Sequence, residues 1–372
     1  MTHADIVSKP GKQNGPAFLG FGYMRLPGDE STVTEMTDAY LEAGFNYFDT
    51  AYIYEGSEEM LNKALVARHP RESYMIADKI PPWKVRGGKD CDKLFDSMLD
   101  RLKVGYLDFL LVHSIDEDND RSARNAGVYG WVAGQKKKGN ARHIGFSFHG
   151  NNELLKKVLE DYPEMDFVQL QLNYTDVLRG RAGTLQETVI KYDKPIIVME
   201  PLRGGALAKL PPAAGALMKA HCPDSSVASW ACRYAATLPG VTCMLSGMSN
   251  SEQMQDNIRT FSPLYPLSKE ETDVIEAVLV ELGKISPIPC TGCKYCMESC
   301  PQQIEIAHSF SLYNDVKRGG QKWNLRTVYN TIPKKHRAAG CVDCGECVKR
   351  CPQHIKIPEE LKKVTEMFSA KH

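Results

Sequence analysis

Eight cysteines near the end of the chain fall into two copies of one spacing. The first copy is Cys290, Cys293, Cys296 and Cys300, and the second is Cys341, Cys344, Cys347 and Cys351. Each copy reads C-x2-C-x2-C-x3-C-P, the spacing that bacterial proteins use to bind [4Fe-4S] clusters. The copies are 51 positions apart. The pattern therefore predicts an internal duplication that binds two [4Fe-4S] clusters.

The fourth cysteine of each copy is expected to serve the other cluster, as it does when two such motifs share a fold. This pairs Cys351 with the first three cysteines of the first copy, and Cys300 with the first three of the second. A zinc site does not need a third cysteine and a proline twice over, and disulfide frameworks belong to small secreted domains. The four isolated cysteines are expected to be small buried hydrophobes: Cys91, Cys222, Cys232 and Cys243.

The charge balance excludes some partners. Lys plus Arg equals Asp plus Glu at 46 each, so no net field favours a nucleic acid or an anionic membrane. The first residues lack the apolar core of an export signal, and no apolar run has the length of a transmembrane helix. A cytoplasmic protein is expected, in a reducing compartment that suits the eight thiolates.

Residues 17–261 alternate short apolar runs with amphipathic stretches, the pattern of βα units. We expect eight strands: Leu19–Leu26, Tyr47–Asp49, Tyr74–Ala77, Leu107–Val112, His143–Ser147, Phe167–Leu172, Ile196–Met199 and Cys243–Ser246. Eight such units over roughly 250 residues predict a (β/α)8 TIM barrel. An open doubly wound sheet is the alternative, but no G-x-G-x-x-G follows the first strand.

The helices expected between the strands are Ser31–Ala43, Ser57–Ala67, Cys91–Leu102, Ser122–Lys138, Asn151–Glu160, Leu185–Lys191, Ser225–Ala236 and Ser251–Arg259. One more helix, Ser268–Lys284, has a capping box of Ser268 and Glu271. The expected domains are a disordered tail at 1–15, an α/β barrel at 16–284, and a smaller, mostly helical ferredoxin-like domain at 285–372.

Four polar side chains lie at or just after the ends of consecutive predicted strands: Asp49, Tyr54, Lys79 and His113. Catalytic groups of such barrels lie at the carboxyl ends of the strands. An ammonium beside a phenol lowers the pKa of the phenol, so Lys79 would prepare Tyr54 to donate a proton to a carbonyl oxygen. Asp49 would hold Lys79, and His113 would orient the carbonyl. Tyr52 is an alternative to Tyr54.

The stretch DTAYIYEGSEE, with Lys79 and His113 at strand ends, resembles the aldo-keto reductase family, whose tetrad is Asp, Tyr, Lys and His in this order. The resemblance covers residues 17–261. Together with the cysteine-rich end, the chain resembles the branch of that family that is fused to a ferredoxin-like domain. It implies reduction of a small-molecule carbonyl or enone with NAD(P)H.

The resemblance also implies a set of nicotinamide coenzyme contacts. Ser147 and Gln169 would contact the carboxamide, and Met199 stands where the family has a tyrosine that stacks on the nicotinamide. Further contacts would come from Leu202, Arg203, Gly204 and Gly205 near the pyrophosphate, and from Ser246, Gly247, Met248, Ser249, Gln253 and Asn257 at the adenosine end. Phe148 replaces the usual Asn, and Ser249 replaces the basic residue that meets a 2′-phosphate. A surface ion pair is the alternative for Arg203, and a tight turn is the alternative for Gly204 and Gly205.

Electron counting adds a further hypothesis. Clusters pass single electrons, whereas a nicotinamide passes a hydride. A flavin converts between the two, and the barrel's phosphate site after strands seven and eight could hold FMN. Electrons would then be exchanged with a ferredoxin-like partner. The alternatives are ordinary NAD(P)H-dependent reduction with structural or redox-sensing clusters, and a non-catalytic relay or regulatory subunit.

Overall fold

The computed structural model describes residues 18–178, 182–290 and 292–369, so the predicted tail at 1–15 lies outside the described residues. The chain divides into two compact units. The first comprises Met1–Gln171, Thr184–Pro201 and Ala235–Pro266, and the second comprises Leu172–Gly183, Leu202–Tyr234 and Leu267–His372. The second unit therefore takes segments from within the range predicted for the barrel, and the boundary at 284 stays a prediction.

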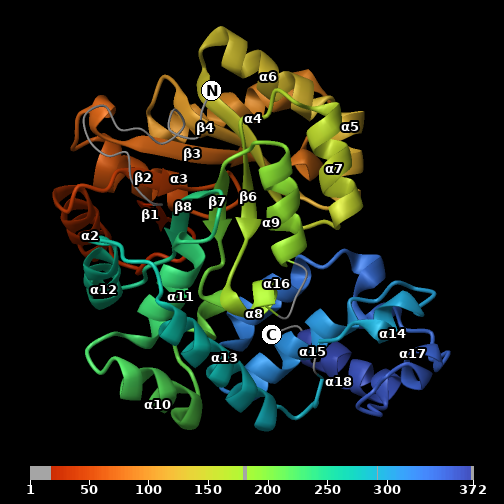
Figure 1. Ribbon diagram of the computed structural model, residues 1–372. Coiled ribbons are helices and arrows are strands. Elements are labelled where there is room, and N and C mark those ends of the chain that lie inside the picture. Colours follow the sequence, from red (N-terminus) through yellow and green to blue (C-terminus); the bar gives the residue numbers. More distant parts are fainter. Residues whose placement is uncertain (1–17, 179–181, 291, 370–372) are drawn as a thin grey trace. The chain divides into compact units, whose positions relative to one another are not determined.

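The first unit contains a closed barrel of eight parallel strands in sequence order (Figure 1). The strands are β1 (Phe18–Gly22), β2 (Tyr47–Asp49), β3 (Met75–Ile80), β4 (Leu107–Ile115), β5 (Ala141–Phe148), β6 (Phe167–Gln171), β7 (Ile196–Met199) and β8 (Val241–Ser246). β1 pairs with β8 through Phe18 and Cys243, which closes the circle. The predicted (β/α)8 barrel is confirmed, and the doubly wound alternative is wrong.

The barrel interior is packed with one side chain in two along each strand, as strand alternation requires. Its fully buried members include Ala77, Phe109, Phe167 and Cys243. Gly145 is needed where β5 passes β6, because a Cβ there would lie 2.5 Å from the carbonyl oxygen of Phe167. Three of the four isolated cysteines, Cys91, Cys232 and Cys243, are fully buried as predicted, and Cys222 is half-buried.

Helices lie outside the strands, as Figure 1 shows for α4, α6 and α7. Those with most of their residues in the first unit are α2 (Glu30–Glu42), α3 (Ser57–Leu61), the π-helix η1 (Asn62–Val66), η2 (Arg71–Ser73), η3 (Pro82–Lys84), α4 (Gly88–Leu102), α5 (Glu117–Asn125), α6 (Val128–Lys138), α7 (Asn152–Asp161), α9 (Ala182–Lys191) and α12 (Ser251–Phe261). The single helix predicted for Ser122–Lys138 is wrong. Gly127 has φ +68°, which ends α5 and starts α6.

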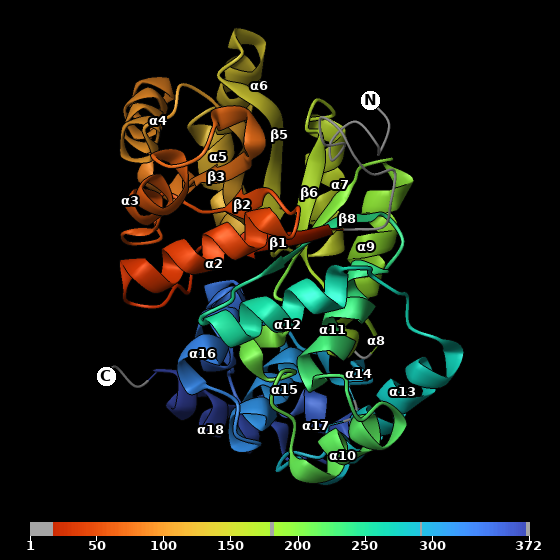
Figure 2. The same cartoon turned by 90° about the vertical axis from the view of Figure 1, so that its left-hand side faces the viewer.

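Among the described residues of the second unit, the regular elements are all helices. Its elements are α8 (Tyr174–Leu178), η4 (Arg203–Gly205), α10 (Pro212–His221), α11 (Val227–Ala236), α13 (Lys269–Lys284), α14 (Tyr295–Glu298), α15 (Ile306–Lys317), α16 (Lys322–Asn330), η5 (Lys334–His336), η6 (Ala338–Gly340), α17 (Glu346–Lys349) and α18 (Ile357–Ser369). The capping box of α13 is present as predicted. α15 contacts both α16 and α18 (Figure 2), around a core that includes Phe310, Leu325 and Phe368.

Candidate active site and cluster-binding cysteines

The four predicted catalytic groups come from three neighbouring strands and one turn. Asp49 is the last residue of β2, Lys79 lies one residue before the end of β3, and His113 lies near the end of β4. Tyr54 lies in the turn between β2 and α3, where its N–H donates to the carbonyl of Ala51 at 2.8 Å. Since parallel strands end on one rim, the turn and the strands bring these groups to the same place.

Lys79 is the centre of the group. Its Nζ lies 2.6 Å from Oδ1 of Asp49 and 2.6 Å from the carbonyl oxygen of Thr50, and the residue is 1% exposed. The same Nζ lies 5.2 Å from the centroid of the Tyr54 ring. The ring of His113 lies 5.9 Å from that of Tyr54 at 83°. The structure therefore brings all four predicted residues together.

The alternative donor, Tyr52, contacts a different side chain from Tyr54. Its ring packs against the guanidinium of Arg101, with Cζ 4.3 Å from the ring centroid. Trp83, in η3 after Lys79, has its ring 5.6 Å from that of His113. Tyr54 is therefore the tyrosine beside Lys79.

The charges of Tyr54 and Lys79 follow from burial and from each other. Burial raises the pKa of Tyr54, and the nearby ammonium of Lys79 opposes this without overcoming it. Burial works against the charge of Lys79, but its interactions with Asp49, Tyr54 and Asp78 together outweigh burial, so the pKa of Lys79 is raised. The sequence predicted a lowered pKa for Tyr54, and the net direction is the opposite. A phenol that keeps its proton at neutral pH is suited to donate it.

Burial, together with the charges of Lys79 and His149, lowers the pKa of His113 well below its usual value of 6.5. The ring is neutral at physiological pH and holds one N–H. A neutral imidazole can donate a hydrogen bond to a carbonyl oxygen without competing with Tyr54 for the role of acid.

We expect His113 to weaken the fold as the pH falls. The unfolded chain takes up a proton on this residue below pH 6.5, whereas the folded chain does not, so stability is lost as the pH drops through that value. A His113→Asn variant is expected to lose less Tm than the wild type between pH 7 and pH 5, by scanning calorimetry. Equal losses in both proteins would contradict a neutral His113.

Two of the residues predicted to contact a nicotinamide lie on adjacent strands of the first unit. Ser147 Oγ accepts a hydrogen bond from the N–H of Ser114 at 2.7 Å. Gln169 is buried, and its Oε1 has no hydrogen-bond partner among the described residues. A buried amide oxygen without a donor fits a ligand that brings an amide N–H, as the nicotinamide carboxamide would. Phe148, which replaces the usual Asn, is buried, and Met199 is half-buried.

The segment after β8 has several of its predicted contacts engaged within the protein. Ser246 Oγ accepts from Asn257 Nδ2 at 2.8 Å, and Gln253 Oε1 accepts from the N–H of Ser249 at 2.8 Å. Met248 is buried. Gly247 is exposed, and a Cβ on it would meet nothing within 4 Å. The open space in this turn therefore lies beside the backbone of Gly247.

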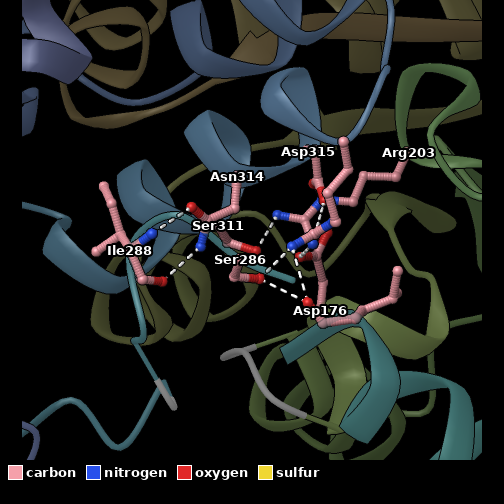
Figure 3. Close-up of polar contacts among 9 residues, drawn as sticks. Asp176, Arg203, Ser286, Ile288, Ser311, Asn314 and Asp315 are labelled. Atoms are coloured by element: carbon pink, nitrogen blue, oxygen red, sulfur yellow. Dashed lines mark hydrogen bonds and ion pairs between the residues drawn. The ribbon is translucent and has the colours of Figure 1, made fainter. Parts of the chain in front are cut away.

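Arg203 lies in the second unit and is 1% exposed, so the surface ion pair that was its alternative is wrong. Its Nε lies 3.1 Å from Asp315 and its Nη1 lies 3.4 Å from Asp176, while Nη2 donates to Ser311 at 3.0 Å (Figure 3). These contacts leave its predicted contact with a phosphate without support. Gly204 has φ +63° in the tight turn predicted for it.

The eight cysteines of the two motifs line two cavities in the second unit. The first cavity is lined by Cys290, Cys293, Cys296 and Cys351, and the second by Cys300, Cys341, Cys344 and Cys347. Each wall thus combines three cysteines of one motif with the fourth of the other. The spaces measure about 310 and 320 Å³, part of each being open to solvent. This is the interleaved arrangement that the spacing predicts.

The duplication is also present in the backbone. Left-handed residues recur 51 positions apart as Gly292 and Asp343, as Lys294 and Gly345, and as Gln303 and His354. The short helices α14 and α17 follow the same offset. A left-handed conformation at six matched positions fixes two copies of one loop around the cysteines.

One cysteine of each motif, Cys296 or Cys347, is buried, and apolar side chains such as Phe310 and Ile357 line the first cavity. Burial raises the pKa of Cys296 to about 12 and that of Cys347 to about 11. In the described part of the chain, no three His, Cys, Asp or Glu side chains are grouped to hold a single metal ion. A [4Fe-4S] cluster is held from outside by cysteines spread over its surface, and cysteines spread over a cavity wall fit that demand.

Comparison with known proteins identifies the family of each region. The Aldo/keto reductase family matches residues 18–280, and a 4Fe-4S dicluster domain matches residues 289–355. The chain therefore belongs to the aldo/keto reductase family, in a form fused to an iron–sulfur domain. None of the described helices combines the length and hydrophobicity that crossing a bilayer requires.

The individual relatives are distant. The chain is 25% identical to L-galactose dehydrogenase of Arabidopsis thaliana, over 68% of this chain and 85% of that protein. It is 26% identical to an aldo-keto reductase of Mycobacterium avium, over 70% and 85%. A holo-form aldo-keto reductase of Bacillus halodurans superposes with a TM-score of 0.59 at 22% identity, over 73% and 95%. One from Klebsiella pneumoniae, in complex with NADP and acetate, also gives 0.59 at 19% identity, over 70% and 90%.

Proposed function

We propose that the barrel reduces a carbonyl group, or an activated C=C bond next to one, with Tyr54 as the proton donor. The observation that carries this proposal is the contact of Lys79 with both Asp49 and the Tyr54 ring. Tyr54 donates its Oη proton to the carbonyl oxygen, and the phenolate that remains is stabilised by the ammonium of Lys79. Asp49 holds that ammonium in place, and His113 donates a hydrogen bond to the same carbonyl oxygen.

The coenzyme of this proposal is NADH or NADPH, which would supply the hydride when bound. The Klebsiella pneumoniae relative, solved with NADP, supports a nicotinamide coenzyme. In this chain the unpartnered Oε1 of Gln169 and the hydroxyl of Ser147 fit the carboxamide. Ser249 stands where a base would meet a 2′-phosphate, and its hydroxyl donates to the backbone carbonyl of Arg25 at 2.9 Å. Activity assays with NADH and with NADPH would therefore determine which coenzyme the protein prefers.

The eight cysteines would hold two [4Fe-4S] clusters that carry electrons one at a time. Coupling them to hydride chemistry calls for a flavin, and FMN is the candidate. The flavin part of the proposal rests on electron counting. If extracts of the purified, active protein contain no flavin by absorbance and fluorescence, this part is removed and the remainder stands.

A ferredoxin-like protein is the proposed electron partner. Residues 285–372 contain 14 Lys and Arg against 8 Asp and Glu, although the whole chain is balanced. Each oxidised cluster with its four thiolates would subtract about two charges, which leaves a smaller positive charge on the module. A positive module attracts a negatively charged carrier and speeds its association at low salt. The charge excess therefore supports an acidic one-electron carrier as the partner.

The test compares two electron sources on the wild type and on Cys347→Ala, both prepared without oxygen. With clusters in the electron path, the variant is expected to lose reduced-ferredoxin-driven turnover and keep NAD(P)H-driven turnover of a panel of aldehydes, ketones and enones. Equal loss or equal retention of both activities would point to structural or sensing clusters. Oxidation of neither donor across the panel would point to a non-catalytic relay subunit.

A further inference from the structure

Two buried acids lie behind the candidate catalytic lysine, on the outer side of the barrel wall. Adjacent residues of a strand point to opposite faces. Lys79 continues the inward series of Met75 and Ala77, so Asp78 faces the surrounding helices. There it meets Glu58 from the first turn of α3. Asp78 is 0% exposed and Glu58 is 1% exposed.

The hydrogen bonds around this pair leave two oxygens without a donor. Asp78 Oδ1 accepts the N–H of Lys79 at 2.7 Å, and Glu58 Oε2 lies 2.5 Å from Nη2 of Arg101. No donor among the described residues reaches Asp78 Oδ2 or Glu58 Oε1. The two side chains interact with each other. Two carboxyl groups can be joined by a hydrogen bond only when one of them carries a proton, so one shared proton would satisfy both unpartnered oxygens.

The pair joins the two pieces of chain that hold the donor and its lysine. Glu58 follows Tyr54 by four residues, in the helix that begins as soon as the Tyr54 turn ends. Asp78 immediately precedes Lys79 and holds its backbone N–H. The N–H of Tyr52 also meets the carbonyl of Lys79, at 3.4 Å. A bond between Glu58 and Asp78 would therefore link the backbone of the Tyr54 turn to that of Lys79.

We propose that Glu58 and Asp78 form a proton-sharing clasp that positions Tyr54 against Lys79, and that loss of the shared proton opens this clasp at alkaline pH. The clasp rests on the proposed function, because it acts through the Tyr54–Lys79 pair. It adds a positioning element outside the barrel, in contact with neither substrate nor coenzyme.

The neighbouring charges make the shared proton necessary. Arg101 from α4 is the cation that faces the pair from the helices, and its Nε also lies 3.9 Å from Glu59. From the strand side the pair faces Lys79, whose Nζ is bound to Asp49. A second carboxylate charge at the pair would have no cation of its own. Burial raises the pKa of Glu58 to about 9, with the charge of Asp78 adding to the effect.

The test uses Glu58→Gln, whose amide N–H can donate to Asp78 at any pH, with Glu59→Gln as the matched control on the next residue. The wild type and the control are expected to lose kcat through an alkaline step with an apparent pKa of about 9. In Glu58→Gln this step is expected to disappear, leaving the later step of Tyr54. Glu58→Ala is expected to lose about tenfold in kcat at pH 7 with unchanged coenzyme affinity, and Glu58→Gln to restore most of it.

A second measurement separates failure of the clasp from failure of the proposed function. The folded pair keeps a proton that the unfolded chain releases, so wild-type Tm is expected to fall as the pH rises from 6 to 9, more than that of Glu58→Gln. If Glu58→Gln does not fold, Asp78→Asn replaces it with the same expectation. A Tm difference with an unchanged kcat profile would overturn the positioning role, and identical Tm slopes would overturn the shared proton. If Tyr54→Phe retains full activity, the proposed function fails while the Tm comparison still reports on the proton.

Discussion

A Tyr54→Phe variant is expected to lose about 10²- to 10⁴-fold in kcat for carbonyl reduction, the usual contribution of a positioned general acid. The substitution removes the hydroxyl and keeps the ring, which packs 5.2 Å from Lys79 Nζ and 5.9 Å from the His113 ring. Coenzyme affinity and Tm are therefore expected to change little. Steady-state kinetics with NADPH or NADH, together with fluorescence titration of the coenzyme, would check both parts.

The matched control is Tyr52→Phe, two residues earlier in the same turn. Its ring packs on Arg101, and that contact survives loss of the hydroxyl. This variant is expected to keep kcat within about threefold of the wild type. A hydroxyl that does not contact the reacting atoms contributes little to the activation barrier. A large loss in Tyr52→Phe with a small one in Tyr54→Phe would identify Tyr52 as the proton donor and contradict the proposal. A loss confined to KM would mean that Tyr54 binds substrate without donating to it.

The grouping of the four candidate catalytic residues could be predicted because three consecutive strands carry a polar residue at or near their ends, after an apolar run. Asp49, Lys79 and His113 terminate or nearly terminate three consecutive strands, and a closed parallel barrel brings such ends to one rim. Tyr54 required the turn geometry as well. The sequence offered Tyr52 equally, and the structure separates the two by placing the Tyr54 ring beside Lys79 and the Tyr52 ring against Arg101.

The direction of the Tyr54 pKa could not be predicted, because it depends on the balance of two opposed effects. The sequence supplies the nearby ammonium but not the degree of burial, and burial is the larger effect here. Arg203 was misread for the same reason. A single arginine in a glycine-rich turn resembles a surface residue, and the carboxylates that surround it, Asp176 and Asp315, are 27 and 112 positions away in sequence.

The Glu58–Asp78 pair was missed, although a signal was available. Asp78 interrupts the apolar run MIADKI at an outward position, and the outer face of a barrel strand is covered by helices. An acid there must be buried and needs a partner. Glu58 lies three residues before Leu61 in α3, hence on the same side of the helix as an apolar position. Both faces of a barrel strand are buried, so a charged residue on the outward face indicates a buried partner on a neighbouring helix.

Replacement of Cys351 by alanine is expected to remove the cluster that the first motif holds, rather than the one beside it in sequence. Cys351 lines the cavity of Cys290, Cys293 and Cys296, while Cys300 lines that of Cys341, Cys344 and Cys347. Each cubane holds four irons, so iron is expected to fall from about eight to about four per chain. Metal analysis of protein purified without oxygen would give the count.

Spectroscopy of four variants would then decide the pairing. Cys351→Ala and Cys290→Ala are expected to leave the same residual EPR spectrum on reduction, and Cys300→Ala and Cys341→Ala to leave the other. The control is Cys222→Ala, whose thiol contacts Ser225 Oγ at 2.9 Å and lines neither cavity, so that its iron content and both spectra persist. If Cys351→Ala instead matches Cys341→Ala, each motif holds its own cluster and the cavity walls do not report the ligands. Loss of both clusters in every motif variant would leave the pairing without support, because the core that the two motifs share would then fold only when both cavities are filled.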